Sequence, residues 1–537
     1  MKILTKNSRI FICMLVAGSM MLSCKKTLDV LPYTSFSDAT AFTSAARVEA
    51  AVNGVYDAAQ SGFYAGGAVR SYPFGAANIE QGDMRGEDLN NDQLFYQGTY
   101  EASYNNVSAN QQYMFETLYS LINKANLVMD GINDAVSKGV ITQAMGNQYL
   151  GECRFLRAMA HHELVINYAR PYADGNGNKQ GIIYREVGVN SPDKVASEKA
   201  KTRSTVADNY TKILADLDFA ETNLPTVATD NSGNAVSTFR ASKAAAIALK
   251  MRVKLHMQDW SGVITEANKL VPAAAPFISP IGGFTLAANP GDPFVLPGTN
   301  KENIFSIRNA ATDNGGVNGA LGNMFTSATT GGRGLVKVSP IIYNLPAWKC
   351  DDKRRSLLLG VGLTGTSGAY FTTKYKDPTT SSDPAPQIRY AEVLLILAEA
   401  EARNNAAIST RALDLLNAVR NRSLATPATQ AYTLADFPTK NALIKAILDE
   451  RRIEFLAEGK RWGDIHRLAI DPVFGTGGIP AKIGTGAIRT SMYSCGAGSS
   501  TYTTALAPIP YSDFRFIWPI PLSETQQNPN YVQNPGY

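Results

Sequence analysis

The sequence predicts a mainly α-helical protein, and three observations support this fold class. Apolar residues recur in steps of three and four over long segments, as from Phe115 to Ile132 and from Tyr149 to Leu164, which is the spacing of one buried helix face. Short links between these segments favour antiparallel neighbouring helices. Hydrophobic residues make up 45% of the chain and charged residues 18%, so a large packed core can form.

The first helical part is expected at residues 45–271. Its clearest boundaries belong to the stripe from Val206 to Leu224, where Thr205 is a plausible N-cap with Asp208 three residues later and Pro225 ends the helix. Small residues in the following stripe let helix backbones approach closely: Ala244, Ala245, Ala246 and Ala248. Helix pairs at this spacing resemble tetratricopeptide-like repeats, whose period is about 34 residues, so we expect an α–α superhelix.

The periodicity fades over residues 272–386, where Gly, Pro, Asn, Ser and Thr become frequent. Long segments without clear helices are more often functional than idle, so we expect this insert to form the ligand face. Helical stripes return in residues 387–537, for example from Ala391 to Ala402 and from Ile444 to Phe455. From Asp471 onward we expect an extended, loop-rich tail.

The first residues have the pattern of a bacterial lipoprotein signal. Lys2, Lys6 and Arg9 precede an apolar run that ends at Leu22 and is shorter than the roughly 20 residues that span a bilayer as a helix. The run closes on the cleavage box Met21-Leu22-Ser23-Cys24. We therefore expect residues 1–23 to be removed, Cys24 to carry lipid, and residues 24–44 to form a tether to the membrane.

Charge and cysteine content exclude several classes of protein. Loss of Lys2, Lys6 and Arg9 leaves 48 basic against 46 acidic side chains, and this near balance argues against a nucleic-acid partner. The remaining cysteines, Cys153, Cys350 and Cys495, are odd in number and widely spaced, which predicts neither a disulfide framework nor a zinc site. Cys153 lies in an apolar helical stripe and is expected in the core. No cofactor is expected.

A dense run of charges between residues 450 and 464 could be mistaken for a catalytic centre. It holds Glu450, Arg451, Arg452, Glu454, Glu458, Arg461 and Asp464. Because structural ion-pair networks also perturb titration, we interpret the run as a paired network that locks helices together.

An ordered set of short motifs along the mature chain identifies a family resemblance. The motifs are Val52-Asn53-Gly54-Val55-Tyr56, Ile122-Asn123-Lys124-Ala125-Asn126, Glu152-Cys153-Arg154-Phe155-Leu156-Arg157-Ala158, Arg389-Tyr390-Ala391-Glu392-Val393-Leu394-Leu395, Leu416-Asn417-Ala418-Val419-Arg420, Glu450-Arg451-Arg452-Ile453-Glu454-Phe455, Gly459-Lys460-Arg461-Trp462-Gly463-Asp464 and Trp518-Pro519-Ile520-Pro521. With the lipoprotein box, this set resembles the SusD/RagB family of outer-membrane nutrient-binding lipoproteins.

The resemblance implies a non-catalytic protein with a tetratricopeptide-like helical scaffold. Such proteins sit on the outer surface of a Gram-negative outer membrane, held by lipid. They cap a SusC-like TonB-dependent transporter and hand it oligosaccharides, or peptides in some members. Their ligand contacts lie in loops outside the shared motifs, so no binding residue is transferred by motif.

Candidate ligand contacts follow from sugar chemistry. A sugar ring has an apolar C–H face and a polar rim, so its site needs an aromatic plane beside carboxylate, amide or arginine groups. Two regions offer this combination: the segment from Phe63 to Tyr104, which includes Tyr64 and Phe95, and the loop-rich insert. The predicted contacts are Trp348, Tyr72, Phe74, Asp83, Arg85, Asp88, Tyr96, Phe325 and Tyr343.

Trp348 is the strongest single candidate, because it lies in loop-rich sequence between Ala347 and Lys349 and close to Asp351. The competing interpretation for every aromatic residue here is that it fills the core. Two other functions also stay open. One is a peptide-binding relative on the same scaffold; the other is a lipid-anchored glycosidase, for which adjacent carboxylates such as Asp351 and Asp352 could serve if they faced one cleft.

Overall fold

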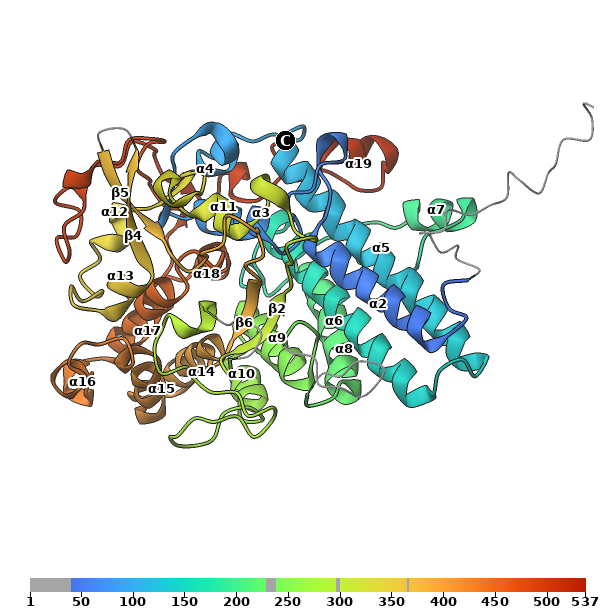
Figure 1. Ribbon diagram of the computed structural model, residues 1–537, viewed down its shortest axis with the longest axis horizontal. Helices are drawn as coiled ribbons and strands as arrows, with labels where there is room; N and C mark the ends of the chain where they lie inside the picture. The colour runs from blue at the N-terminus through green and yellow to red at the C-terminus, as the bar shows by residue number, and fades with distance from the viewer. Residues whose placement is uncertain (1–39, 228–237, 296–299, 365–366) are drawn as a thin grey trace, which may run out of the picture.

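The computed structural model describes residues 40–227, 238–295, 300–364 and 367–537. The predicted signal peptide, Cys24 and most of the tether lie outside these residues. The described chain is mainly helical, as predicted (Figure 1). The long helices of the N-terminal half fill one side of the molecule, and the helices and strands of about residues 340–460 lie toward the other end, while the last helix, residues 522–527, lies back beside the N-terminal helices.

The long helices form one continuous packed series. They are α2 (Ala45–Gln60), α5 (Ala109–Ser137), α6 (Gln143–Tyr168), α8 (Val206–Asn223), α9 (Lys243–His256), α10 (Trp260–Ala267), α14 (Tyr390–Asn404), α15 (Thr410–Asn421), α17 (Lys440–Glu454) and α18 (Arg461–Leu468). α2 packs on α5, α5 on α6, α6 on α8, α8 on α9, α9 on α10, and α10 on α14, which also contacts α15 and α17. The predicted arrangement of neighbouring helices is therefore confirmed.

Local sequence signals explain where these helices begin and how closely they pack. Thr205 and Asp208 form a capping box at the start of α8, with the Thr205 hydroxyl accepting from the Asp208 backbone N–H and the Asp208 carboxylate accepting in return. α8 ends at Asn223, two residues before Pro225. The alanines of α9 are buried, and α9 contacts helices on several sides. Cys153 lies in the core, as predicted.

The shorter elements connect distant parts of the chain. The short helices are α3 (Ala76–Met84), α4 (Gln97–Tyr100), α7 (Pro192–Lys199), α11 (Leu321–Phe325), α12 (Pro340–Tyr343), α13 (Lys353–Leu357), α16 (Pro427–Gln430) and α19 (Leu522–Gln527). The antiparallel strand pairs are β1 (Leu89–Asn91) with β3 (Val336–Val338), β2 (Asn303–Ile307) with β6 (Ala385–Arg389), β4 (Leu359–Thr364) with β5 (Ser367–Thr372), and β7 (Gly478–Ile479) with β8 (Ile509–Pro510).

The insert between α10 and α14 is more ordered than its sequence suggested. Strand pairs of two to six residues and one-turn helices are too short to produce a recognisable apolar period. The β1–β3 pair, with Leu89 opposite Val338, joins this insert to the segment after α3. Both regions that the sequence offered as ligand faces therefore belong to one neighbourhood.

Within the described part of the chain, no helix combines the length and the apolar character needed to cross a membrane.

Candidate ligand-binding site

Most of the predicted ligand contacts are buried. Of the nine, Tyr343 alone keeps partial exposure; the buried ones are Tyr72, Phe74, Asp83, Arg85, Asp88, Tyr96, Phe325 and Trp348. In this structure their side chains do not present a surface to a ligand, and each has a partner or a packing role inside the fold.

The charged members of this set hold segments together. Asp83 accepts from the backbone N–H groups of Gly459 and Arg461, at 3.1 Å each, and burial raises the pKa of the Asp83 carboxyl to about 7. Arg85 places its guanidinium carbon 3.2 Å from the ring centroid of Trp462 and donates to Asn167. Asp88 accepts from Arg452.

The charge run between residues 450 and 464 forms a buried ion-pair network, as predicted. Glu454 contacts Arg354 at 3.0 Å, Arg389 at 3.0 Å and Arg422 at 2.7 Å. Glu458 pairs with Arg389 and with Lys374, both at 2.7 Å. Burial works against ionisation of Glu454, yet the three arginines hold its pKa well below the usual range. The further pairs are Arg354–Glu450, Arg451–Asp464, Arg452–Asp88, Arg461–Glu87 and Arg467–Glu399.

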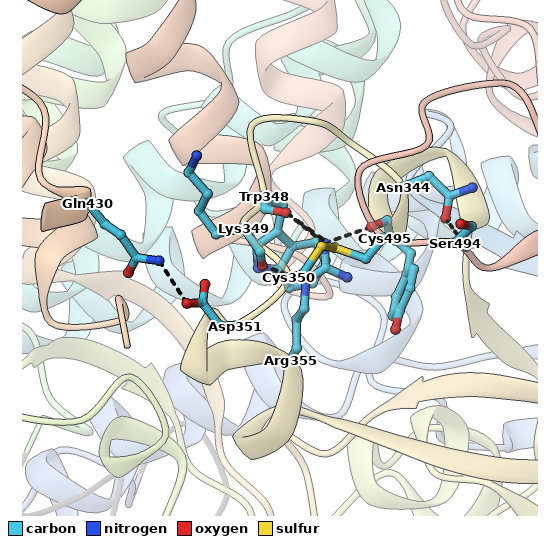
Figure 2. Close-up of a disulfide and its surroundings, with 10 residues drawn as sticks. Asn344, Trp348, Lys349, Cys350, Asp351, Arg355, Gln430, Ser494 and Cys495 are labelled. Atoms are coloured by element: carbon cyan, nitrogen blue, oxygen red, sulfur yellow. Dashed lines mark hydrogen bonds between the residues drawn. A yellow bond between two sulfur atoms is a disulfide. The ribbon is translucent and has the colours of Figure 1, made fainter. Parts of the chain in front are cut away.

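Trp348 is 2% exposed, which corrects its prediction as an open binding platform. A disulfide between Cys350 and Cys495, which are 145 residues apart, brings the tail against it (Figure 2). Arg355 stacks its guanidinium 4.2 Å from the Trp348 ring centroid and donates to the Trp348 carbonyl at 2.9 Å. The sequence predicted no disulfide framework, and the structure corrects this with one cross-link, because two cysteines so far apart leave no spacing signal.

Tyr343 lies beside this cross-link in a small cluster of tyrosines. Its ring stacks on Tyr370 with centroids 4.5 Å apart, and Tyr493 meets both rings edge-on. The Tyr493 hydroxyl donates to the Val338 carbonyl at 2.7 Å, which fixes the cluster against β3. All three rings of this stack are partly buried.

A second aromatic surface lies over the segment that follows α2. We call it the aromatic patch; it consists of Phe63, Tyr64, Phe95 and Tyr113 with the cations Arg70 and Arg333. Tyr64 lies 4.5 Å from Tyr113, and Phe63 meets Tyr113 edge-on at 6.2 Å, as centroid distances. Phe63 is 38% exposed, and Leu94, beside Phe95, is 75% exposed.

The backbone of this segment explains why the rings reach solvent. The chain turns back on itself after Tyr64, whose N–H donates to the Ala68 carbonyl at 2.8 Å. Gly66 and Gly67 occupy the turn with φ of 70° and 77°, a conformation that side-chain-bearing residues rarely adopt. The turn lifts Phe63 and Tyr64 off the end of α2.

Two of the predicted contacts form the layer beneath the patch. Tyr72 lies parallel under Tyr64 at a centroid distance of 5.9 Å, and its hydroxyl donates to Asn110. Tyr96 meets Phe95 edge-on at 4.9 Å. The predicted contacts Tyr72 and Tyr96 therefore lie one layer beneath the outer rings of the same segment. Tyr64 and Phe95 were in the same predicted region, and no local sequence signal distinguishes the outer rings from the inner ones.

The two cations of the patch have unusual surroundings. Arg70 places its guanidinium carbon 3.9 Å from the Tyr64 centroid and 4.8 Å from that of Phe95. Arg333 lies 5.3 Å from the Phe95 centroid. Neither forms an ion pair with any residue that the structure describes, and the Nε atom of Arg70 is buried without a hydrogen-bond partner.

A cavity of about 770 Å³ lies along α2, the helix that precedes Phe63 and Tyr64 of the patch in the chain. It is lined by one face of α2, by Phe239 and Arg240, and by residues 307–313. Gln60, at the end of α2, donates to Asn309 at 2.9 Å, while its own Oε1 is buried without a partner. Beyond the cavity the same segment packs on the patch, since a Cβ on Gly319 would lie 2.6 Å from the Arg70 backbone.

Comparison with known proteins agrees with this architecture. A family model described as "SusD family" matches residues 364–537, and one described as "Starch-binding associating with outer membrane" matches residues 26–255. SusD-like protein P38 from Formosa agariphila is 24% identical over 86% of this chain and 91% of its own length.

Solved structures share the fold over nearly their whole length. A SusD superfamily protein from Bacteroides fragilis aligns with a TM-score of 0.72 and 26% identity, covering 91% of this chain and 99% of that one. A SusD-like carbohydrate binding protein from Bacteroides vulgatus aligns with a TM-score of 0.70 and 17% identity, covering 91% of this chain and 97% of that one. The chain belongs to the SusD/RagB family.

Proposed function

We propose that this protein is an outer-membrane lipoprotein that binds oligosaccharides and delivers them to a SusC-like TonB-dependent transporter, without catalysing a reaction on them. Family membership supports glycan binding, because the matching family model and the Bacteroides vulgatus relative are both described by carbohydrate binding. The observation that carries the proposal is the aromatic patch together with the cavity along α2. We place the ligand there.

The patch and the cavity supply the two kinds of contact that a sugar chain needs. The exposed ring of Phe63 and the partly buried rings of Tyr64, Phe95 and Tyr113 give an apolar surface on which C–H faces can stack. The cavity adds amide and carboxylate groups, including the unpartnered Oε1 of Gln60, which can accept from a hydroxyl. A volume of about 770 Å³ lies within the range of ordinary small-molecule sites and holds a few sugar units.

The glycosidase alternative finds no support in the carboxylates that suggested it. Asp352 caps α13 and pairs with Arg354 at 2.7 Å, while Asp351 accepts from Gln430 at 2.7 Å (Figure 2). The two side chains serve different partners and do not face one cleft. The peptide-binding alternative makes a different prediction in the experiment below.

Isothermal titration of the purified, detergent-solubilised chain against panels of oligosaccharides and of peptides tests the proposal. We expect binding of at least one glycan class, and loss of about tenfold or more in affinity on Tyr64→Ala or Phe95→Ala, because each removes a stacking plane. Phe514→Ala is the matched control, since Phe514 is 39% exposed but packs on Tyr537 instead. Binding of peptides alone, or hydrolysis of glycans, would overturn the proposal.

The anchor and the partner need separate tests. Cys24→Ala should release the folded chain from membranes in fractionation, because each buried CH₂ of the acyl chains contributes about 0.8 kcal/mol to membrane binding. Retention of that variant would contradict lipid anchoring. Affinity purification of the lipidated chain from outer membranes should recover a large β-barrel transporter, and recovery of the chain alone would count against delivery.

A further inference from the structure

The aromatic patch brings two guanidinium groups to one ring. Arg70 and Arg333 come from segments far apart in the chain, yet their guanidinium carbons lie 4.8 Å and 5.3 Å from the centroid of Phe95. Arg70 also lies 3.9 Å from the centroid of Tyr64. Two like charges this close repel each other unless an anion or solvent screens them.

The neighbouring acidic groups do not supply that anion. Asp92 pairs with Lys337, and Glu101 accepts from Gln97 and Thr485. Glu80 lies fully buried behind the patch, where neither of its carboxylate oxygens has a hydrogen-bond partner. Burial raises the pKa of the Glu80 carboxyl well above its ordinary value, although the charge of Arg333 acts in the opposite direction.

Several buried arginines elsewhere in the molecule have carboxylate partners. Arg354, Arg389, Arg422 and Arg467 each contact one or more carboxylates at 3.0 Å or less. Arg85 has none, but it is fully buried between the rings of Trp462 and Trp518 and donates to Asn167 and to the Phe516 carbonyl. Arg70 and Arg333 differ from all of these in being only partly buried, so they leave a local positive charge on the face where we place the ligand.

The geometry suits an acidic sugar. An arginine guanidinium binds carboxylate or sulfate groups through paired N–H donors, and stacking on a ring orients it beforehand. A sugar lying on Phe95 or Tyr64 would bring a substituent on its ring edge to Arg70 and Arg333. The Nε atom of Arg70 has no hydrogen-bond partner among the described residues.

We infer that the aromatic patch selects oligosaccharides that carry anionic groups, with Arg70 and Arg333 pairing those groups while Tyr64 and Phe95 stack on the sugar rings. This inference rests on the proposed function and narrows its substrate class. Carboxylate-bearing and sulfate-bearing sugars share the chemistry that the arginines recognise, and the experiment distinguishes them.

Titration against three probe sets tests the inference: neutral maltohexaose and laminarihexaose, carboxylated oligogalacturonate, and sulfated carrageenan oligosaccharides. We expect at least one acidic set to bind about tenfold or more tightly than both neutral probes, a difference of about 1.4 kcal/mol. The preference should shrink as salt rises from 50 to about 500 mM, because salt screens exposed charges. The set that binds shows whether carboxylate or sulfate is preferred.

Variants then assign the preference to the two cations. Arg70→Gln and Arg333→Gln should each weaken acidic-glycan binding about tenfold, and should weaken it more than they weaken neutral-glycan binding. Arg333→Lys keeps the charge but loses the paired donors. Its affinity for acidic glycans should therefore lie between those of the wild type and Arg333→Gln. Arg489→Gln is the control, because Arg489 is exposed and donates only to backbone carbonyls. Circular dichroism confirms that each variant is folded.

The outcomes separate this inference from the proposed function. Equal or tighter binding of neutral probes, lost on Phe95→Ala, would overturn the inference and leave glycan binding intact. Acidic binding that is insensitive to both Gln variants would overturn the assignment to Arg70 and Arg333. Failure of every saccharide to bind would overturn the proposed function and the inference together.

Discussion

Arginines in two regions of this protein have opposite surroundings. In the buried ion-pair network, Glu454 alone contacts Arg354, Arg389 and Arg422. In the aromatic patch, Arg70 and Arg333 lie over rings and form no ion pair with any described residue. A fully buried charge without a partner is strongly destabilising, whereas a half-exposed guanidinium stays hydrated. Arg85 shows that an unpaired arginine over rings can also belong to the scaffold when it is fully buried, so the partial exposure of Arg70 and Arg333 is what distinguishes the proposed ligand face.

The largest expected effect comes from breaking the network. Glu454→Ala should lower the free energy of unfolding by about 3–5 kcal/mol, because three buried arginines would lose their shared carboxylate. Asp134→Ala, which removes the partner of Lys138 in a solvent-exposed pair, should lower it by about 1 kcal/mol or less. Chemical denaturation measures both. Equal effects would show that the network does not hold the scaffold.

The disulfide lies in a third region of the molecule, and its removal should affect stability but not glycan binding. Replacing Cys350 and Cys495 together by Ser should lower the free energy of unfolding by about 2–4 kcal/mol, because the cross-link closes a 145-residue loop. Trp348 fluorescence should shift to longer wavelength as the tail loosens. Glycan affinity should stay within about twofold of the parent, since Trp348 is buried and lies outside the proposed site. A large loss of affinity would instead support Trp348 as a contact.

Acidification should lower the free energy of unfolding through four buried histidines, none of which belongs to the aromatic patch. Burial lowers the pKa of His162 and of His466 to about 3, and burial also holds the pKa values of His161 and His256 well below the usual range. Because these imidazoles are neutral when folded and protonate more readily when unfolded, stability is retained above about pH 6.5 and lost as the pH falls toward 3. Each contributes up to about 1.4 kcal/mol per pH unit in that window.

Thermal unfolding at pH 7, 5.5 and 4.5 measures this loss. His162→Gln removes one titrating group, so its melting temperature should fall less steeply with pH than that of the parent, even if its value at pH 7 is lower. A parent melting temperature that stays flat between pH 7 and 4.5 would contradict the account of the histidines.

The smallest expected change in stability belongs to the patch. Arg333→Gln and Phe95→Ala should alter the free energy of unfolding by about 1 kcal/mol or less, because surface substitutions rarely do more. The same variants should carry the largest changes in glycan affinity. If they unfold the protein as strongly as Glu454→Ala does, the distinction between scaffold charge and ligand-face charge fails.

The scaffold could be predicted because its signals are local and repeated. Apolar spacing located the helices, Thr205 with Asp208 marked the start of α8, and the clustered charges near Glu454 indicated a network. The helix and capping signals depend on residues within a few turns of one another. The network was indicated because acidic and basic residues that are clustered in sequence usually pair with opposite charges.

The site was harder to predict, because burial depends on contacts between distant segments. Tyr72 and Tyr64 are eight residues apart and similar in sequence context, yet one lies beneath the other. Trp348 is covered through a disulfide to Cys495, which no spacing reveals. The importance of Arg333 depends on its approach to Phe95, and this too appears only when the chain is folded.

A crystal structure of the protein with a bound oligosaccharide tests the central claim most directly. The account predicts a sugar ring stacked on Tyr64 or Phe95, with its polar edge toward Arg70 and Arg333 or toward the cavity beside Gln60. A glycan bound instead on the Tyr343–Tyr370 stack, with the patch left bare, would contradict it.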